Sequence, residues 1–242
     1  MIKLKKFLKL SYLYLNFIIQ KKTVITFLLS ISLIFIILLF ISDFSIDNYQ
    51  YLKCYEDYHH SYFKNSTFAI MIFNIIFVAS ISISFTIDTN KFDILFISNK
   101  NRNIITTNKI FISSILILLF TLIETIILYF IPVIHFDFYK LGNVFITFIS
   151  FFSINIFELL ILMAITTWVP NIFINLVITF ILIIYNYLIN INKDFRDFMN
   201  LIIPSINVTN SNIYLSSYYL MPFYIIIMTL IYYILYERVD FN

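Results

Sequence analysis

Two carboxyl groups stand inside apolar stretches of the sequence that carry no other charge. Glu124 lies in the run 110–132 and Glu158 in the run 144–167. A carboxylate in hydrocarbon costs on the order of a few kcal/mol, so such residues generally face a bundle interior or a wet cavity. Both are candidates for a substrate path, where they would attract cationic cargo or bond its amides. The alternative is that each is a hydrogen-bonded packing group. At about 1.5 Å per helical residue the two lie at different depths, so we expect no direct contact.

Other residues that could do chemistry form no recognisable site. Adjacent histidines point apart on a strand and diverge on a helix, and the ligand spacing does not repeat, so we expect no metal site. The single cysteine excludes an intrachain disulfide and a cysteine-based zinc site. The chain has no Ser/His/Asp set, no HExxH motif and no acid pair suited to acid–base catalysis, so we expect no enzyme. The potential metal ligands are Cys54, Glu56, Asp57, His59 and His60.

Gly142 is the only glycine in the chain. A phosphate-binding P-loop needs two glycines and a lysine, so that backbone N–H groups can wrap the phosphate. A Rossmann fingerprint needs three glycines. The chain therefore binds no nucleotide by either route, and we expect no cofactor on it. A GxxxG helix-packing motif is excluded for the same reason.

The elements that hold these residues are predicted from composition and length. Of the 242 residues 61% are hydrophobic and 12% are charged, whereas a soluble domain carries about a quarter charged residues. We therefore expect an all-α, polytopic membrane protein with one transmembrane domain. A bilayer core of about 30 Å needs roughly 20 apolar helical residues. Six runs meet this requirement, with five or seven as alternatives: 24–42, 67–87, 110–132, 144–167, 172–191 and 218–236.

Proline and polar residues predict the connections near the end of the chain. Pro170 and Asn171 break a charge-free stretch and indicate a tight hairpin between the fourth and fifth spans. Pro222 falls in the first turn of the sixth span, where a missing N–H costs little. The segment 198–217 contains Pro204 and many polar residues, which argue against a span. We expect short interfacial or re-entrant helices there, on the outer side.

The basic residues predict the orientation of the spans. Eleven of the 16 lysines and arginines lie in the leader 1–22, the loop 88–109 or the C-terminal tail. The opposite loops hold the other five, together with seven acidic residues. Positive charge near span ends marks the cytoplasmic side, so we expect a multi-pass cell-membrane protein with both termini in the cytoplasm. The leader has the pattern of an amphipathic helix lying on membrane lipids; a basic leader without fixed structure is the alternative.

The loop between the second and third spans is too apolar for a plain linker. Phe92, Leu95 and Phe96 fall at positions i, i+3 and i+4, so a short helix would present them together. An exposed apolar cluster on the inner face of a membrane protein is typical of a protein docking site. The alternative is that this cluster packs under the bundle or on lipid headgroups.

In this loop the chain resembles the ABC-2 family of ATP-binding-cassette transporter permeases. In that family an acidic residue closes span 2, a coupling helix rich in Thr, Phe and Leu follows, and a basic stretch leads into span 3. The residues of this chain that match the pattern are Asp88, Phe92, Leu95, Lys100, Arg102 and Lys109.

The resemblance continues to the end of the chain. The family typically shows a Leu-Leu-Pro-like turn and short outer helices before span 6, and this chain has Ile202-Ile203-Pro204. It also typically has a Phe-Arg-Arg-Asp-like tail, where this chain has Tyr236-Glu237-Arg238-Val239-Asp240. Length, leader and span number match as well. The chain departs from the family in having almost no glycine and few small residues in its spans.

The resemblance implies a division of labour between polypeptides. Two permeases, identical or sister chains with a contact on spans 1 and 5, would be clamped to two cytosolic ABC ATPases that bind ATP and Mg²⁺. The cargo would be hydrophobic or amphipathic, in particular exported peptides such as bacteriocins or phenol-soluble modulins. No nucleic acid is expected as a partner. The coupling residues would be Asp88, Lys91, Phe92, Leu95, Phe96, Lys100 and Arg102.

Two readings from other classes stay open. One is a proton-driven secondary transporter in which Glu124 and Glu158 form the relay. Against it stands the absence of Gly- or Pro-interrupted spans at matching positions of the two halves. The other is an assembly factor that binds partners in the membrane and transports nothing.

Overall fold

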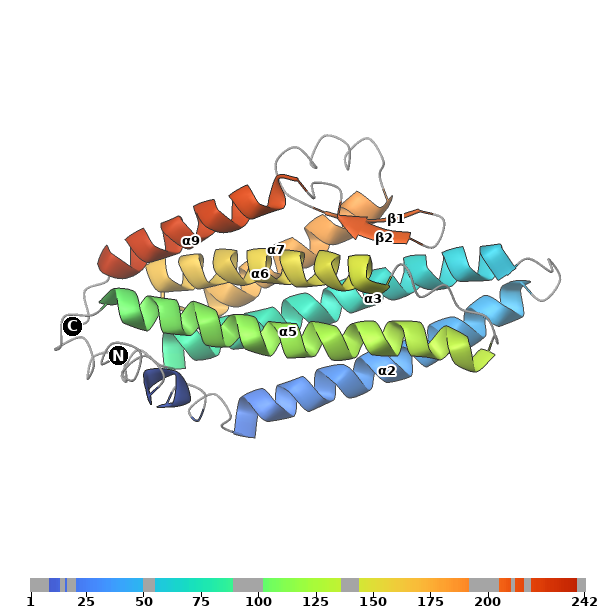
Figure 1. Ribbon diagram of the computed structural model, residues 1–242, viewed down its shortest axis with the longest axis horizontal. Coiled ribbons are helices and arrows are strands. Elements are labelled where there is room, and N and C mark those ends of the chain that lie inside the picture. The colour runs from blue at the N-terminus through green and yellow to red at the C-terminus, as the bar shows by residue number, and fades with distance from the viewer. Residues whose placement is uncertain are drawn as a thin grey trace.

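The computed structural model of the chain is an elongated bundle of long helices that run alternately in opposite directions (Figure 1). Every backbone N–H and C=O in hydrocarbon must be bonded internally, which is why uninterrupted helices form where the sequence is apolar. The structure describes residues 9–13, 16, 21–49, 55–88, 102–135, 144–191, 205–209, 212–215 and 219–238.

Five helices are long and apolar enough to cross a membrane, so this is a multi-pass helical membrane protein. Four of them contain a predicted span in full, and α3 contains the second predicted span up to Ile83, with a π-helical turn covering the rest. The last two of them match the predicted limits to within a residue, whereas the first three extend further at one or both ends, into polar sequence. The five are α2 (Lys21–Tyr49), α3 (Tyr55–Ile83), α5 (Arg102–His135), α6 (Val144–Trp168) and α7 (Ile172–Ile191).

The predicted sixth span, 218–236, overlaps helix α9 (Met221–Arg238), which has Pro222 in its first turn as expected. Glu237 and Arg238 occupy its last turn, and α9 is not among the five helices that qualify as crossings by length and composition. It packs along α6. The structure therefore establishes the helix but not a sixth crossing.

The predicted tight turn between α6 and α7 is confirmed. Asn171 caps α7, because its side-chain oxygen accepts the backbone N–H of Phe173 at 2.8 Å. The carbonyl of Asn171 accepts the N–H of Asn175 at 3.2 Å, the first bond of the new helix. An asparagine at this position satisfies an N–H that would otherwise lack an intrahelical partner.

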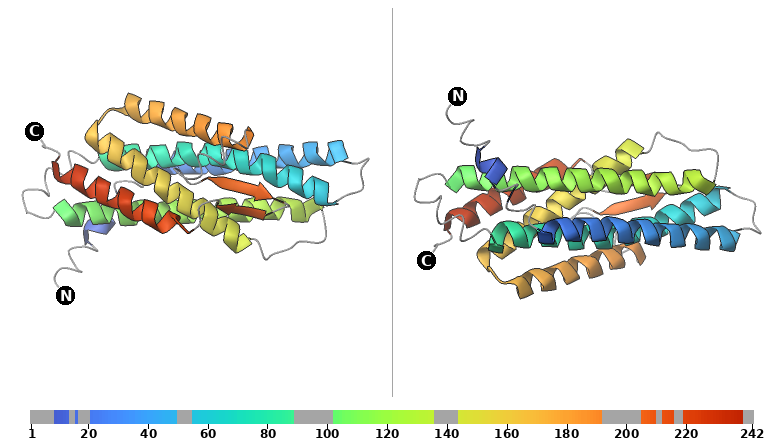
Figure 2. Two further views of the ribbon diagram at one scale, coloured as in Figure 1. Left: turned by 90° about the horizontal axis from the view of Figure 1, so that it is seen from above. Right: turned by 90° about the horizontal axis from the view of Figure 1, so that it is seen from below.

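Helices α3 and α6 form the centre of the bundle. Helix α2 packs against α3 and α5, α7 packs against α3 and α6, and α9 covers another side of α6 (Figure 2). Large apolar side chains of α2 and α7 point outward, among them Phe40, Phe173 and Phe180. Such an apolar exterior would be unstable in water and suits contact with lipid.

The segment between α7 and α9 contains a β-hairpin, so the prediction of short helices is wrong for its described part. Strands β1 (Ile206–Thr209) and β2 (Asn212–Leu215) are antiparallel, with Val208 opposite Ile213. The hairpin packs against α3 and α6 (Figure 2). Its alternate apolar residues are buried or half-buried and join the core. Because side chains of a strand alternate between two faces, a strand can bury all of these residues on one face. This explains why strands form here instead of the predicted short helices. Residues 192–204 lie outside the described part.

Helix α3 ends in a π-helical turn, η1 (Ser84–Asp88). The Thr86 hydroxyl donates to the backbone carbonyl of Ser82 at 2.6 Å. Such bonds to the preceding turn distort α-helices, and single π turns occur often at functional sites. The second crossing therefore finishes in a locally widened turn directly before the predicted docking segment.

Candidate functional site

The predicted ATPase-docking segment begins and ends on described elements. Asp88 is the last residue of η1 and Arg102 is the first residue of α5. The intervening candidates lie outside the described residues, so their predicted helix and their exposure stay predictions. They are Lys91, Phe92, Leu95, Phe96 and Lys100.

The start of α5 is attached to the end of α9. The Arg102 guanidinium donates to the backbone carbonyl of Glu237, and the hydroxyls of Thr107 and Tyr233 share a hydrogen bond. Lys109 is fully buried, with its ammonium 5.1 Å from the centre of the Tyr236 ring. A cation over an aromatic face is attracted by the ring quadrupole.

These contacts correct the predicted limits of the loop 88–109. Arg102 and Lys109 belong to helix α5, which starts eight residues before the predicted span at 110. Helix α5 starts earlier than predicted because contacts with α9 hold its polar first part. It is also held by the N-terminal segment, because Ser11 donates a hydrogen bond to Asn108. The role of Arg102 in docking is a separate matter and stays a prediction.

The described part of the N-terminal leader contacts the bundle. Residues 9–13 are helical, as an amphipathic leader requires. Leu10 is buried in the hydrophobic core, whereas Lys9 and Tyr12 are exposed. This short helical segment, residues 9–13, lies at the same end of the molecule as the start of α5 and the end of α9 (Figure 1). Membrane-surface binding by the leader stays a prediction.

The other end of the docking segment is attached to different helices. The Ser82 hydroxyl shares a hydrogen bond with Thr166 of α6 at 3.2 Å. Asn175 of α7 donates to the same hydroxyl at 3.3 Å, and η1 itself packs against α6. Residues 89–101 thus connect a polar cluster on α3, α6 and α7 to the joined ends of α5 and α9.

Glu124 is fully buried in the middle of the bundle. The side-chain nitrogen of Asn74 on α3 donates to its Oε1 at 2.9 Å. One turn earlier on α5, Thr121 accepts a hydrogen bond from Asn155 of α6 at 3.2 Å. We call Asn74, Thr121, Glu124 and Asn155 the Glu124 layer. Asn74, Thr121 and Asn155 were not predicted as site residues. Their signal in the sequence was an amide or hydroxyl within an apolar run, which is too common to single out a site.

Glu158 is 5% exposed. The side-chain nitrogen of Asn186 on α7 donates to its Oε1 at 3.2 Å. The two carboxyl groups thus bond to different amides, Glu124 between α3 and α5 and Glu158 between α6 and α7. Both arrangements match the packing alternative, and the substrate-path role of either residue stays a prediction.

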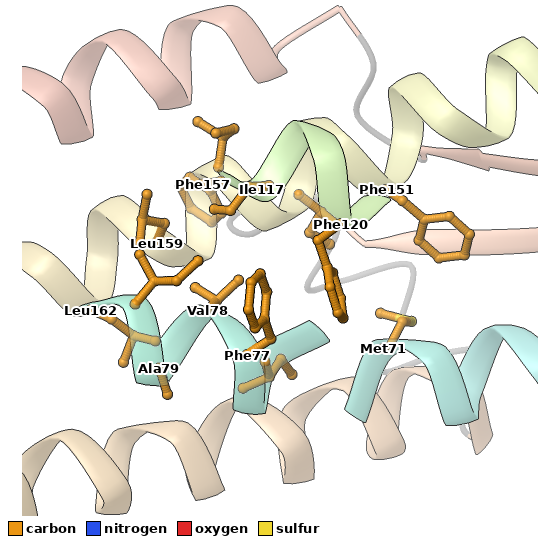
Figure 3. Packing of buried hydrophobic residues seen from close by; sticks show 14 of the residues in the cluster. Met71, Phe77, Val78, Ala79, Ile117, Phe120, Phe151, Phe157, Leu159 and Leu162 are labelled. Carbon is orange, nitrogen blue, oxygen red and sulfur yellow. The ribbon is translucent and has the colours of Figure 1, made fainter. Parts of the chain in front are cut away.

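Aromatic packing lies next to the Glu124 layer. The rings of Phe77 on α3 and Phe120 on α5 stack with centroids 4.0 Å apart and planes 20° apart (Figure 3). Phe27 of α2 contacts both rings edge-on, at 5.6 and 5.7 Å. Phe77 lies three residues from Asn74, and Phe120 directly precedes Thr121. The polar layer is therefore bordered on one side by apolar rings that exclude water.

Comparisons of the chain with protein-family models, curated proteins and solved structures found no match. Within the described ranges, no three His, Cys, Asp or Glu side chains gather into a candidate metal centre. The fold and its apolar exterior define the class as a multi-pass helical membrane protein. Any more specific assignment is a proposal.

Proposed function

We propose that this chain is the membrane-spanning permease subunit of an ATP-driven exporter of the ABC-2 type. A separate cytosolic ATPase would dock on residues 88–102 and supply the energy. The observation that carries the proposal is the attachment of this segment at its two ends. One end continues from the polar cluster of α3, α6 and α7 through Ser82. The other begins at Arg102, which is bonded to α9.

This attachment provides a mechanical route from a docked partner into the membrane. Packed helices transmit displacement because protein interiors are dense and not easily compressed. A push on residues 89–101 would act on the α3 end through η1 and on α5 and α9 through Arg102. Because one end continues from α3 and the other begins α5, the push would shift α3 and η1 relative to α5 and α9, all of which pack around the central α6. Such relative movement is what alternating exposure of a cargo path requires.

A sixth crossing by α9 is part of the proposal. At about 1.5 Å per residue, its 18 residues span roughly 27 Å, close to the bilayer core of about 30 Å. Its outer side is apolar, with Phe223, Ile226 and Leu230 all exposed. With six crossings both termini lie on one side, and the distribution of lysine and arginine places that side in the cytoplasm.

The exterior of the bundle supports a second permease as partner. Helices α2 and α7 have the smallest buried share among the five candidate crossings, and both pack against α3 (Figure 2). These are the first and fifth spans, where the ABC-2 resemblance puts the contact between two permeases. The partner would be a second copy or a sister chain.

The proposed cargo is hydrophobic or amphipathic, with peptides such as bacteriocins as the leading candidates. Between 159 and 192 the chain has no charged residue, and 20% of all residues are aromatic. A nearly uncharged aromatic interior suits molecules that already partition into lipid. Glu124 and Glu158 would contact cationic or amide groups of such cargo when the helices separate.

Co-purification with an ATPase tests the proposal. The tagged chain, isolated in mild detergent from its native membrane, should retain a cytosolic ATPase and hydrolyse no ATP without it. Phe92→Asp combined with Leu95→Asp should abolish that retention by putting charge into the apolar docking cluster. Asn99→Asp adds one charge in the same segment without removing an apolar contact and should retain the ATPase. If the double variant keeps its helix content and its ATPase, docking at this segment is refuted.

One observation favours a second candidate, a proton-driven carrier. Glu124 is a buried carboxyl group within a candidate membrane span, with one oxygen that has no partner among the described residues, and ionisable residues in such positions often belong to proton relays. Transport in reconstituted vesicles separates the candidates. Export that stops with vanadate and persists with an uncoupler supports the ATP-driven permease, and the reverse supports the carrier. A folded chain that moves no cargo with its ATPase present would indicate an assembly factor.

A further inference from the structure

Three helices bring polar side chains together near the centre of the membrane. Asn74 of α3 lies 13 residues after the start and 12 before the end of the candidate span Ser61–Thr86, which α3 and η1 form together. Asn155 is similarly central in α6, which spans Val144–Trp168. On α5, Thr121 and Glu124 are three residues apart and so share one face. All four side chains are at most 1% exposed.

The hydrogen bonds of this layer use both amide nitrogens but leave several oxygens without a partner among the described residues. Each amide nitrogen has an acceptor: Asn74 donates to Glu124 Oε1 and Asn155 donates to Thr121. Three buried oxygens have no donor among the described residues, namely Asn74 Oδ1, Glu124 Oε2 and Asn155 Oδ1. Buried polar atoms are rarely left without partners, because desolvation without a bond is costly. All three unpartnered atoms are acceptors, so what satisfies them must be a donor or a cation.

The negative charge of the Glu124 carboxylate also indicates that a positive charge binds in this layer. In the described part of the chain, Asn74 is the only side chain that interacts with the Glu124 carboxyl group. The nearest other carboxyl group along α6, Glu158, follows Asn155 by three residues and is bonded to Asn186. A carboxylate in a low-dielectric interior is stable only with a compensating positive charge. One positive charge at Glu124 would both neutralise the carboxylate and satisfy unpartnered oxygens.

We propose that the layer formed by Asn74, Thr121, Glu124 and Asn155 is a binding site for a single monovalent positive charge. The charge is held by Glu124 Oε2 with the help of the two amide oxygens. Two sources have this chemistry. A proton on Glu124 Oε2 would donate to Asn74 Oδ1 and close an acid–amide pair. A sodium ion, which prefers oxygen ligands, would be shared among all three oxygens.

The surroundings of the site indicate how the charge exchanges with water. The stacked rings of Phe77 and Phe120 (Figure 3) lie three residues from Asn74 on α3 and directly before Thr121 on α5, and Met71, three residues before Asn74, is also buried. The charge is therefore enclosed while α3, α5 and α6 stay together, and it ties these helices to one another. It leaves only when they separate. The site depends on no docked ATPase, so its test is independent of the proposed function.

Infrared difference spectroscopy on the purified full-length chain distinguishes the two sources. The difference between wild type and Glu124→Gln is recorded in choline, sodium and potassium buffers, with Glu158→Gln as the matched control. A proton source predicts the C=O stretch of a carboxylic acid that is lost in Glu124→Gln and is equal in all three buffers. A sodium source predicts carboxylate bands that shift when sodium replaces choline.

Thermal unfolding of the same samples provides a second readout. If sodium is bound, Tm rises by roughly 4 °C from choline to sodium in wild type, and the rise disappears in Glu124→Gln and shrinks in Asn155→Ala. Asn155→Ala keeps the carboxyl group, so it serves if Glu124→Gln does not fold. Carboxylate bands that do not respond to the cation, together with an unchanged Tm in wild type, would overturn the proposal.

Discussion

The aromatic stack between α3 and α5 allows a quantitative test of packing at the core of the bundle. Phe77 and Phe120 are each 1% exposed and their ring centroids are 4.0 Å apart. In a soluble core, Phe→Ala costs about 3–5 kcal/mol. In a membrane, the unfolded helices remain in lipid, so the transfer part of this cost largely vanishes. We therefore expect a loss of about 1–3 kcal/mol for each single variant, from the cavity and the lost contacts.

The two substitutions should not be additive. Aromatic pairs in contact are worth about 0.5–1.5 kcal/mol beyond their burial, and this coupling is lost in either single variant. The double variant Phe77→Ala/Phe120→Ala should therefore cost less than the sum of the singles by about that amount. Phe111→Ala on the same helix is the control, because Phe111 is 48% exposed and faces lipid. It should change stability by less than about 0.5 kcal/mol.

Unfolding by SDS in mixed detergent micelles, followed by circular dichroism, measures these free energies. The reference state in this assay keeps the helices in micelles, as the argument requires. Strict additivity of the two single variants would refute the stack. A Phe111→Ala loss as large as that of Phe77→Ala would refute the assignment of inner and outer faces on α5.

Two further predictions concern local structure, each with its own measurement. In a Cys54→Ser background, Val208→Cys with Ile213→Cys should form a disulfide seen on gels, because these residues are directly opposed; the non-opposed pair Val208→Cys with Leu215→Cys should form markedly less, and equal cross-linking would contradict the register. Asn171→Ala should cost about 1 kcal/mol in the SDS unfolding assay by removing the cap of α7, whereas Asn171→Asp should be nearly neutral; equal losses would exclude capping as the cause.

Sequence reasoning was most accurate for the fourth and fifth spans and the turn between them. The predicted spans 144–167 and 172–191 agree with α6 and α7, and the turn at Pro170 and Asn171 is where it was expected. It was less accurate at polar ends, where α5 begins at Arg102 rather than at 110. An apolar run predicts only the part of a helix that lies inside the membrane. The helix continues beyond that part where other segments contact it, as α9 and the N-terminal segment contact the start of α5.

The β-hairpin had a signal in the sequence that the prediction passed over. Ile206 and Val208, then Ile213 and Leu215, alternate with polar residues on either side of a short Asn-Ser connection. This period of two is typical of a hairpin. The run of polar residues was interpreted instead as evidence against a span and for short helices. Burial of the apolar face against α3 and α6 makes the strands stable here.

The amino-acid sequence by itself determined that the chain is a multi-pass helical membrane protein and where most of its helices lie. These follow from residue-by-residue transfer into lipid, a property that each segment carries without its neighbours. Only the tertiary structure decided that Asn74 bonds to Glu124, that Asn155 joins them from α6, and that Arg102 holds α9. Such pairs lie 34 to 135 residues apart, and they form only when particular helix faces meet, which no local pattern specifies.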